Sequence, residues 1–206
     1  MADVDFYFDF ISPYTYLART QLDGISVRTG ARFRLWPMHI LNLMKIVGNT
    51  PTTVVCSNKR KYAGQDLRRW CARYQVPLND NPHLFKGDHS LTLKGALVAQ
   101  EMNLEDRYNS AMFAAFWTDA VNIGDRGELV RHLDVAGLDG SAILKKAEEP
   151  EYAKRLEANT QLAADRGAFG SPTFIVGNDL FFGNDRLDFL EAKLTKGASQ
   201  SELERS

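Results

Sequence analysis

The sequence predicts an α/β fold in which both ends of the chain contribute strands to one sheet and a long helical segment separates them. Three observations lead to this prediction: a strand-helix-strand order at the start, helical periodicity from about residue 40 to 166, and a hairpin followed by a helix at the end. With 206 residues, 44% of them hydrophobic and 25% charged, the chain has the composition of an ordinary globular protein.

The first part of the chain reads as strand, helix, strand. Residues 4–10 alternate apolar and polar side chains, a period of two that is typical of a strand. Ser12 and Pro13 follow as an N-cap and a proline at the first helical position, where its missing N–H is not needed. Residues 31–37 alternate again and end at a proline, which predicts a second strand.

The middle of the chain is helical and the end returns to strands. Apolar residues recur every three or four positions between residues 40 and 166. The predicted helices there span 63–74, 91–102, 107–121, 128–136 and 149–166. Strands follow at 173–176 and 180–182, joined by a two-residue turn. A last helix is predicted over 184–194, and we expect the polar tail from residue 197 onward to fray.

Charge and cysteine content narrow the classes of function. The formal net charge is -1, so no overall field attracts nucleic acid or an anionic membrane, although Lys59-Arg60-Lys61 forms a local basic cluster. Cys56 and Cys71 match neither a C-x-x-C pair nor the spacing of zinc ligands. The chain shows no signal-peptide pattern and no apolar run of about 18 residues. We expect a cytoplasmic protein with reduced thiols, no metal, and no nucleic-acid or membrane partner.

Two polar corners flanking the strands are candidates for a site. Ser12 stands at a helix N-terminus, where unpaired N–H groups and the helix dipole favour an anion such as a thiolate, although a simple cap is the alternative. Ser171 and Pro172 precede a buried strand. A cis bond there would free the Ser171 backbone to pair with an extended ligand, whereas a trans proline would only open the strand.

Residues 182–185 and two lysines could bind charged groups. Backbone N–H groups of Phe182-Gly183-Asn184-Asp185 could hold a carboxylate while the Asp185 side chain takes an ammonium, which suits the α-amino-acid end of a peptide. A plain N-cap at Asn184 or Asp185 is the alternative. Lys45 or Lys59 could bind a carboxylate as a mobile charge, but a lysine in a charged run is also typical of a solvated face.

Five short segments of the chain, taken together and in this order, carry a resemblance to a known family. They are Asp5-Phe6-Tyr7-Phe8-Asp9-Phe10-Ile11-Ser12-Pro13-Tyr14, Lys45 with Gly48-Asn49, Asp66-Leu67-Arg68-Arg69-Trp70, Phe169-Gly170-Ser171-Pro172-Thr173 and Phe182-Gly183-Asn184-Asp185-Arg186. Together, over residues 4–195, they resemble the 2-hydroxychromene-2-carboxylate isomerases, which belong with the kappa-class glutathione transferases. The resemblance implies a thioredoxin-like domain formed by residues 1–38 and 167–206, with an all-helical domain inserted at 39–166.

The resemblance also implies a glutathione site with a role for each residue. Ser12 would be the catalytic residue, because its hydroxyl would donate a hydrogen bond to the glutathione sulfur and favour the thiolate. Ser171 and Pro172 would meet the cysteinyl part of glutathione. The γ-glutamyl end would be received by Phe182, Gly183, Asn184 and Asp185. The pocket of the small aromatic substrate would be lined by Lys45, Asn49, Asn58 and Lys59.

The implied activity is the interconversion of 2-hydroxychromene-2-carboxylate and trans-o-hydroxybenzylidenepyruvate-type compounds in aromatic catabolism, by a homodimer with glutathione as cofactor. In the family reaction the bound thiolate adds to a conjugated carbon, the ring opens, the former double bond rotates as a single bond, and elimination returns glutathione. Residues 50–58 and the stretch 86–92 match no pattern, and we expect both to touch substrate.

Other activities remain open at this point. One alternative is a kappa-like transferase that conjugates glutathione to electrophiles, and another is a non-catalytic module that binds glutathione or a peptide. Dithiol exchange needs two sulfurs, and the corner Ser12-Pro13-Tyr14-Thr15 has none.

Overall fold

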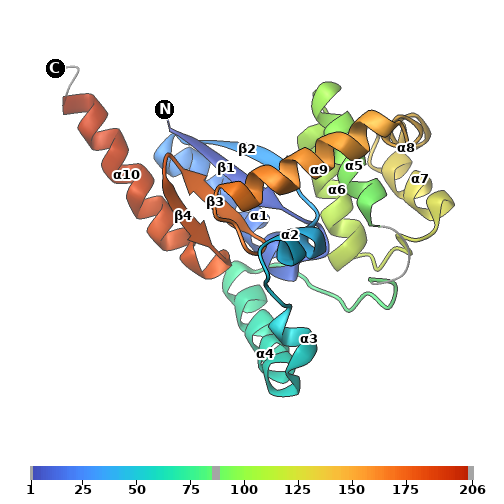
Figure 1. Cartoon of the computed structure of the whole chain (residues 1–206), viewed down its shortest axis with the longest axis horizontal. Helices are drawn as coiled ribbons and strands as arrows, with labels where there is room; N and C mark the ends of the chain where they lie inside the picture. The colour runs from blue at the N-terminus through green and yellow to red at the C-terminus, as the bar shows by residue number, and fades with distance from the viewer. Residues whose placement is uncertain (1, 85–88, 204–206) are drawn as a thin grey trace.

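The computed structural model describes residues 2–84 and 89–203 and contains a four-stranded sheet with helices packed around it (Figure 1). In chain order the elements are β1 (Asp3–Phe8), α1 (Pro13–Thr29), β2 (Arg32–Pro37), α2 (Ile40–Ile46), α3 (Thr52–Val55), α4 (Ser57–Tyr74), α5 (Ser90–Glu101), α6 (Glu105–Trp117), α7 (Arg126–Val135), α8 (Gly140–Ala147), α9 (Pro150–Asp165), β3 (Thr173–Val176), β4 (Asp179–Phe182), the 3-10 helix η1 (Asn184–Arg186) and α10 (Leu187–Leu203).

The sheet has the order β2-β1-β3-β4. β1 pairs in parallel with β2 and antiparallel with β3, and β3 forms an antiparallel hairpin with β4. Gly177 turns this hairpin with a φ of +59°, a value that glycine adopts without steric strain. Because α2 to α9 all lie between β2 and β3 in sequence, the fold is thioredoxin-like with a helical insertion, as predicted.

β1 is the centre of the core, and both of its faces are buried. On one face the ring of Phe6 stacks on Phe174 of β3 with centroids 4.9 Å apart. On the other face, Tyr7 packs in a second apolar cluster that contains Met38 and Leu43. The polar positions of the predicted alternation therefore do not face solvent. Asp5 is only 3% exposed, because β2 and β3 flank it and helices cover both faces of the sheet.

Asp5 is stabilised as a carboxylate by its neighbours. It accepts hydrogen bonds from the Arg34 guanidinium and the Trp36 indole, and it forms an ion pair with Arg166. Burial acts to raise the pKa of Asp5, but the hydrogen bonds from Arg34, Arg166 and Trp36 outweigh it and lower the pKa below its usual value. This network ties the edge strand β2 and the segment after α9 to the central strand.

The helical segment differs from the prediction at its shortest helices and at the polar start of α4. The short helices α2, α3 and α8 were not predicted, because four to eight residues give too few repeats of the apolar spacing. α4 begins at Ser57, whereas the predicted helix began at residue 63. The prediction missed the first turns because they carry no apolar stripe and no residue of α4 is fully buried. The last helix, predicted to end at residue 194, extends to Leu203, and the expected fraying of the tail stays a prediction. Among the described residues, no helix is both long and apolar enough to cross a membrane.

The first strand and the helical insertion share one core. Phe10, just after β1, packs edge to face on Phe113 of α6 with centroids 4.9 Å apart. The indole of Trp117 donates a 2.7 Å hydrogen bond to the Phe10 carbonyl. The loop between β1 and α1 is therefore held by the insertion as well as by the sheet. The division into a domain of residues 1–38 and 167–206 and a domain of residues 39–166 stays a prediction.

Candidate active site

Ser12 caps helix α1 and also contacts the loop before β3. Its backbone is extended, with φ -91° and ψ 115°, and its Oγ accepts a hydrogen bond from the Thr15 N–H at 3.3 Å. The Ser12 hydroxyl in turn donates to the carbonyl of Ser171 at 2.9 Å. Ser12 is thus the N-cap that the sequence offered as the simple interpretation, but its hydroxyl hydrogen is directed at a second candidate residue.

The Ser171–Pro172 peptide bond is cis, which the sequence left open. The Ser171 hydroxyl accepts the Asp9 N–H at 3.0 Å and shares a hydrogen with the Thr15 hydroxyl at 2.7 Å. The Pro172 carbonyl accepts the Gly183 N–H at 3.0 Å. One chain of hydrogen bonds therefore runs from the start of α1, through the cis-proline loop, to the start of η1.

The segment from Gly183 to Asp185 begins with a backbone conformation that favours glycine. Gly183 has a φ of +98°, and a Cβ there would clash with the Asp185 carboxylate. Asn184 is 3% exposed, and its side-chain nitrogen is buried without an acceptor among the described residues. The Asp185 carboxylate pairs with Arg186 at 2.6 Å. This segment therefore presents one unused donor, on Asn184, and one partly neutralised carboxylate.

Helix α4 brings further side chains to the same region. The Tyr14 hydroxyl of α1 donates to the Asp66 carboxylate at 3.3 Å. Burial, then the negative charge of Asp66, and more weakly that of Asp185, raise the pKa of Tyr14 above its usual value. Tyr74 donates to the Asn184 carbonyl at 3.3 Å. The sequence placed Asp66 in a family motif without a role, and it gave no signal for Tyr74, whose contact depends on how α4 packs.

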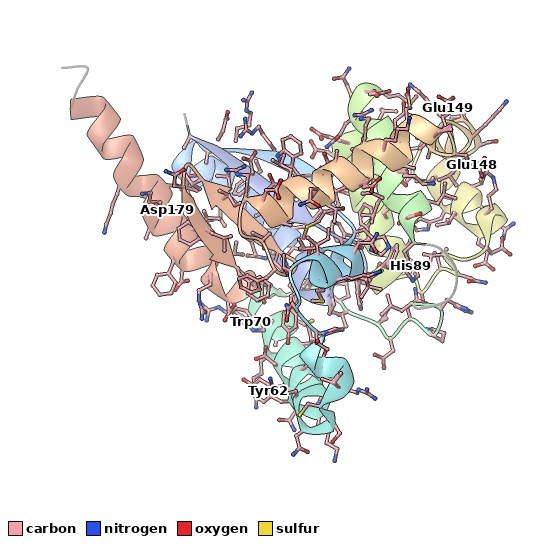
Figure 2. All side chains as sticks on the ribbon, in the orientation of Figure 1. Tyr62, Trp70, His89, Glu148, Glu149 and Asp179 are labelled. Carbon is pink, nitrogen blue, oxygen red and sulfur yellow. The ribbon has the colours of Figure 1, made fainter. Side chains whose placement is uncertain are left out.

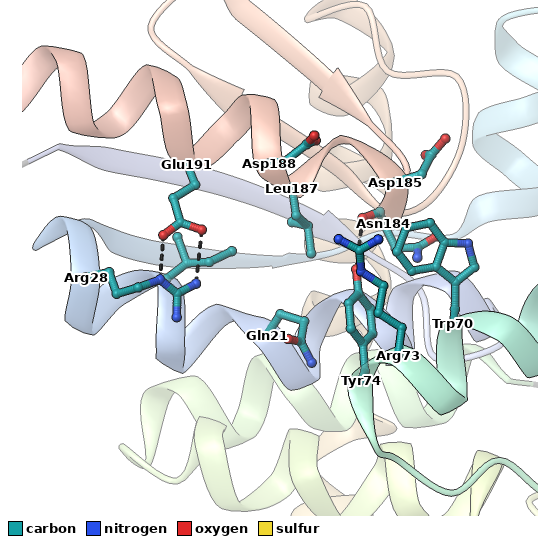
Figure 3. Close-up of a pocket in the computed structure, with 11 residues that line it drawn as sticks. Gln21, Arg28, Trp70, Arg73, Tyr74, Asn184, Asp185, Leu187, Asp188 and Glu191 are labelled. Atoms are coloured by element: carbon teal, nitrogen blue, oxygen red, sulfur yellow. Dashed lines mark hydrogen bonds and ion pairs between the residues drawn. The ribbon is translucent and has the colours of Figure 1, made fainter.

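A cavity of about 220 Å³ lies between α1, α4 and the start of α10 (Figure 3). Trp70, Arg73 and Tyr74 line it from α4, and Asn184 and Asp185 line it from η1. The outer part of α4 projects away from the sheet. Figure 2 shows Tyr62 on that projecting part, where it is 60% exposed, and Trp70 nearer to the sheet. The cavity therefore extends the region of Asn184 and Asp185 toward a helix rich in cations.

A model of the DSBA-like thioredoxin domain matches residues 3–195 of the chain. The chain belongs to the DSBA-like thioredoxin domain family. It is 36% identical, over 93% of its length and 97% of the relative's, to a 2-hydroxychromene-2-carboxylate isomerase of Sphingobium xenophagum. It is 28% identical to glutathione S-transferase kappa 1 of Caenorhabditis elegans, over 91% of its own length and 88% of the relative's.

The solved structures agree with these relatives. A structure of 2-hydroxychromene-2-carboxylate isomerase superposes with a TM-score of 0.87 at 26% identity, covering 97% of this chain and 98% of that one. The resemblance to the isomerases and the kappa-class transferases, first seen in five sequence segments, is therefore confirmed, as is the thioredoxin-like fold.

Within this DSBA-like chain, the predicted site residues fall into two groups. Ser12, Ser171, Pro172 and Gly183 are linked by the hydrogen bonds described above. Asn49 joins them, because its side-chain amide donates to the Phe169 carbonyl at 2.7 Å. The ring of Phe182 packs on Phe169 with centroids 4.5 Å apart.

The remaining residues that were predicted to bind substrate are exposed on helices. Lys45 lies in the last turn of α2, and Asn58 and Lys59 lie in the first turn of α4. None of the three has a hydrogen bond to Ser12 or Ser171 in the described part of the chain, and their roles stay predictions. In the unmatched stretch, residues 86–88 lie outside the described residues, while His89 packs edge to face on Phe116.

Proposed function

We propose that this DSBA-like chain is a glutathione-dependent isomerase that interconverts 2-hydroxychromene-2-carboxylate and trans-o-hydroxybenzylidenepyruvate-type compounds. The observation that carries the proposal is the position of the Ser12 hydroxyl, at the start of α1 and 2.9 Å from the Ser171 carbonyl of the cis-proline loop. The isomerase name of the relative that is 36% identical supports the reaction class. The resemblance further suggests a cytoplasmic homodimer acting in aromatic catabolism.

The residues around η1 fit the γ-glutamyl end of glutathione. The buried amide nitrogen of Asn184 has no acceptor among the described residues, so it can donate to a carboxylate without losing an existing bond. The Asp185 carboxylate lies next to it and can take an ammonium, sharing its charge with Arg186. When bound, glutathione would supply a thiol that can add to a conjugated carbon of the substrate and leave again.

Ser12 would hold the ligand's sulfur rather than attack the substrate. A hydrogen bond from a neutral donor to a charged acceptor contributes about 1.5–3 kcal/mol, which corresponds to lowering the thiol pKa by roughly one to two units. The N-terminus of α1 adds to this effect, because its dipole favours negative charge. Ser12 can turn its hydroxyl to the sulfur only by giving up the bond to Ser171, while its cap to Thr15 uses a lone pair and can stay.

The test is an assay of the purified protein with 2-hydroxychromene-2-carboxylate in the presence and absence of glutathione. We expect turnover only with glutathione, a large loss of kcat/KM in Ser12→Ala, and no loss in Ser141→Ala, an exposed serine of α8. The same rate without glutathione would contradict the proposed mechanism. A homodimer is checked separately by sedimentation.

A second candidate is a transferase that conjugates glutathione to electrophiles. It is favoured by the 28% identity to glutathione S-transferase kappa 1, which extends over 91% of this chain. The fate of glutathione distinguishes the two activities. An isomerase returns glutathione unchanged, whereas a transferase consumes one molecule for each product molecule, so a thiol titration before and after complete turnover decides between them.

A further inference from the structure

Asp9 is a buried carboxylate at the turn between β1 and α1. It is 1% exposed, and none of the ion pairs among the described residues involves it. Burying a carboxylate without a cation is costly, and such groups cluster at functional sites. Neither the sequence motifs nor the proposed reaction assigns Asp9 a role.

The two carboxylate oxygens of Asp9 hold two different segments. One accepts the Ile11 N–H at 3.2 Å, inside the turn that leads to Ser12. The other accepts the Ile40 N–H at 2.8 Å, at the first residue of α2. An amide in place of the carboxylate offers one acceptor oxygen, and its NH2 group would face the second N–H. An ionised aspartate therefore satisfies this site, and an asparagine does not.

The backbone of Asp9 contacts the candidate site directly. Its N–H donates to the Ser171 hydroxyl at 3.0 Å, and its carbonyl accepts the Ser12 N–H at 3.2 Å. Both partners of the Ser12–Ser171 hydrogen bond are thus attached to this one residue. Through Ile40, Asp9 also fixes the start of α2, and Asn49, just beyond that helix, contacts the Phe169 carbonyl.

We propose that Asp9 is a positioning residue whose ionised carboxylate fixes the turn and the start of α2, so that Ser12 is held at the geometry needed to bind the ligand's sulfur. The inference rests on the proposed role of Ser12. Misplacement of a reacting or binding group by about 1 Å can reduce the rate roughly 10²-fold. We expect a loss of this size in kcat/KM when the carboxylate is replaced.

The proposal has a consequence for the dependence of activity on pH. Burial raises the pKa of Asp9 to about 6, against the opposing effect of the N–H groups of Ile40 and Ile11 and the charge of His39. His39, the N-cap of α2, is the titratable neighbour that acts on Asp9 in the described residues. Protonation of Asp9 would turn one acceptor into a donor that faces an N–H. Protonation of the bound thiol lowers kcat/KM at acid pH in any variant, so Asp9 should add a second, separate fall as the pH drops below about 6, and this second fall is the acid limb assigned to Asp9.

The test compares Asp9→Asn and Asp9→Glu with Asp139→Asn, which removes an exposed carboxylate that caps α8. The readouts are the pH profile of kcat/KM and the pKa of bound glutathione, followed by the ultraviolet absorbance of its thiolate. Asp9→Asn should lower kcat/KM roughly 10²-fold, remove the acid limb and raise the pKa of the bound thiol. Asp9→Glu should restore part of the activity with a shifted limb, and Asp139→Asn should match the wild type.

Three outcomes would overturn the inference about Asp9 while leaving the proposed role of Ser12 intact. One is an Asp9→Asn variant with wild-type kcat/KM and pH profile. Another is an acid limb that is unchanged in Asp9→Glu, a result that remains informative if Asp9→Asn fails to fold. The third is a bound thiol whose pKa rises in Ser12→Ala but not in Asp9→Asn. If Ser12→Ala itself leaves that pKa unchanged, the proposed role of Ser12 is wrong, and the inference built on it falls with it.

Discussion

The buried charge of Asp9 should lower the stability of the protein at neutral pH. Its pKa is raised from 3.8 to about 6 in the folded chain, mainly because burial disfavours the carboxylate. Because the pKa of Asp9 is higher in the folded chain than in the unfolded chain, Asp9 contributes most to the free energy of unfolding when the pH is below its unfolded pKa. This contribution is lost as the pH rises through its folded pKa. A shift of about two units corresponds to roughly 3 kcal/mol in the free energy of unfolding, and about half of it falls between pH 5 and 7.5.

A difference measurement isolates this effect from all other titrating groups. Urea unfolding of the wild type and of Asp9→Asn, followed by circular dichroism at several pH values between 5 and 7.5, gives two curves of unfolding free energy against pH. The mismatched amide adds a constant offset, but the gap between the curves should move in favour of the variant by roughly 1–1.5 kcal/mol as the pH rises. A gap that stays constant, or that moves in favour of the wild type, would refute the reasoning.

Three further changes test other parts of the structure. Gly183→Ala, at a φ of +98°, should lower the free energy of unfolding by about 1–3 kcal/mol in urea titrations and should weaken glutathione binding in calorimetry. A variant with unchanged stability and binding would contradict the geometry of this turn. α4 carries six basic side chains and one acidic one, so its positive charge should attract an anionic substrate. Arg73→Gln should therefore lower kcat/KM for such a substrate about twofold at low salt but not at high salt. Lys145→Gln on α8 should leave kcat/KM unchanged at both salt concentrations. Leu190→Ala, at a fully buried position of α10, should lower the free energy of unfolding by about 2–5 kcal/mol. Phe189→Ala, at a position that is 60% exposed, should change it by no more than about 0.5 kcal/mol. Equal losses in the two variants would mean that α10 packs on the sheet through a different face.

The sequence was sufficient for the elements with strong local patterns. The hairpin of β3 and β4 was predicted to within one residue, since its strand-forming residues flank a glycine turn. The helices with regular apolar spacing were also found. The start of α4 was placed too late, because no residue of the helix is fully buried and the side chains that pack against the core, such as Leu67, Trp70 and Tyr74, lie in its second half.

The residues of the candidate site were easier to name than to connect. Ser12, Ser171 and Gly183 carry local signals, a cap, a proline and a glycine, and the structure links all three. Asp9 carried no such signal. In the sequence it is one more polar position in an alternating strand, and its importance appears only when Ile40, far along the chain, donates to its carboxylate. Contacts of this kind depend on tertiary packing, which periodicity does not encode.

The corner Ser12-Pro13-Tyr14-Thr15 carries hydroxyls and no sulfur, which fits the proposal that this site binds a sulfur from outside. Thr15 is fully buried, and its hydroxyl bonds the Ser171 hydroxyl at 2.7 Å, so the cis-proline loop is fixed to α1 without a covalent link. The Ser12 hydroxyl bonds the Ser171 carbonyl, the same group that an extended ligand would use for its own N–H. A ligand N–H that takes this carbonyl weakens its hold on Ser12. On the proposed function, backbone pairing of the ligand therefore releases the hydroxyl to the sulfur that arrives with it.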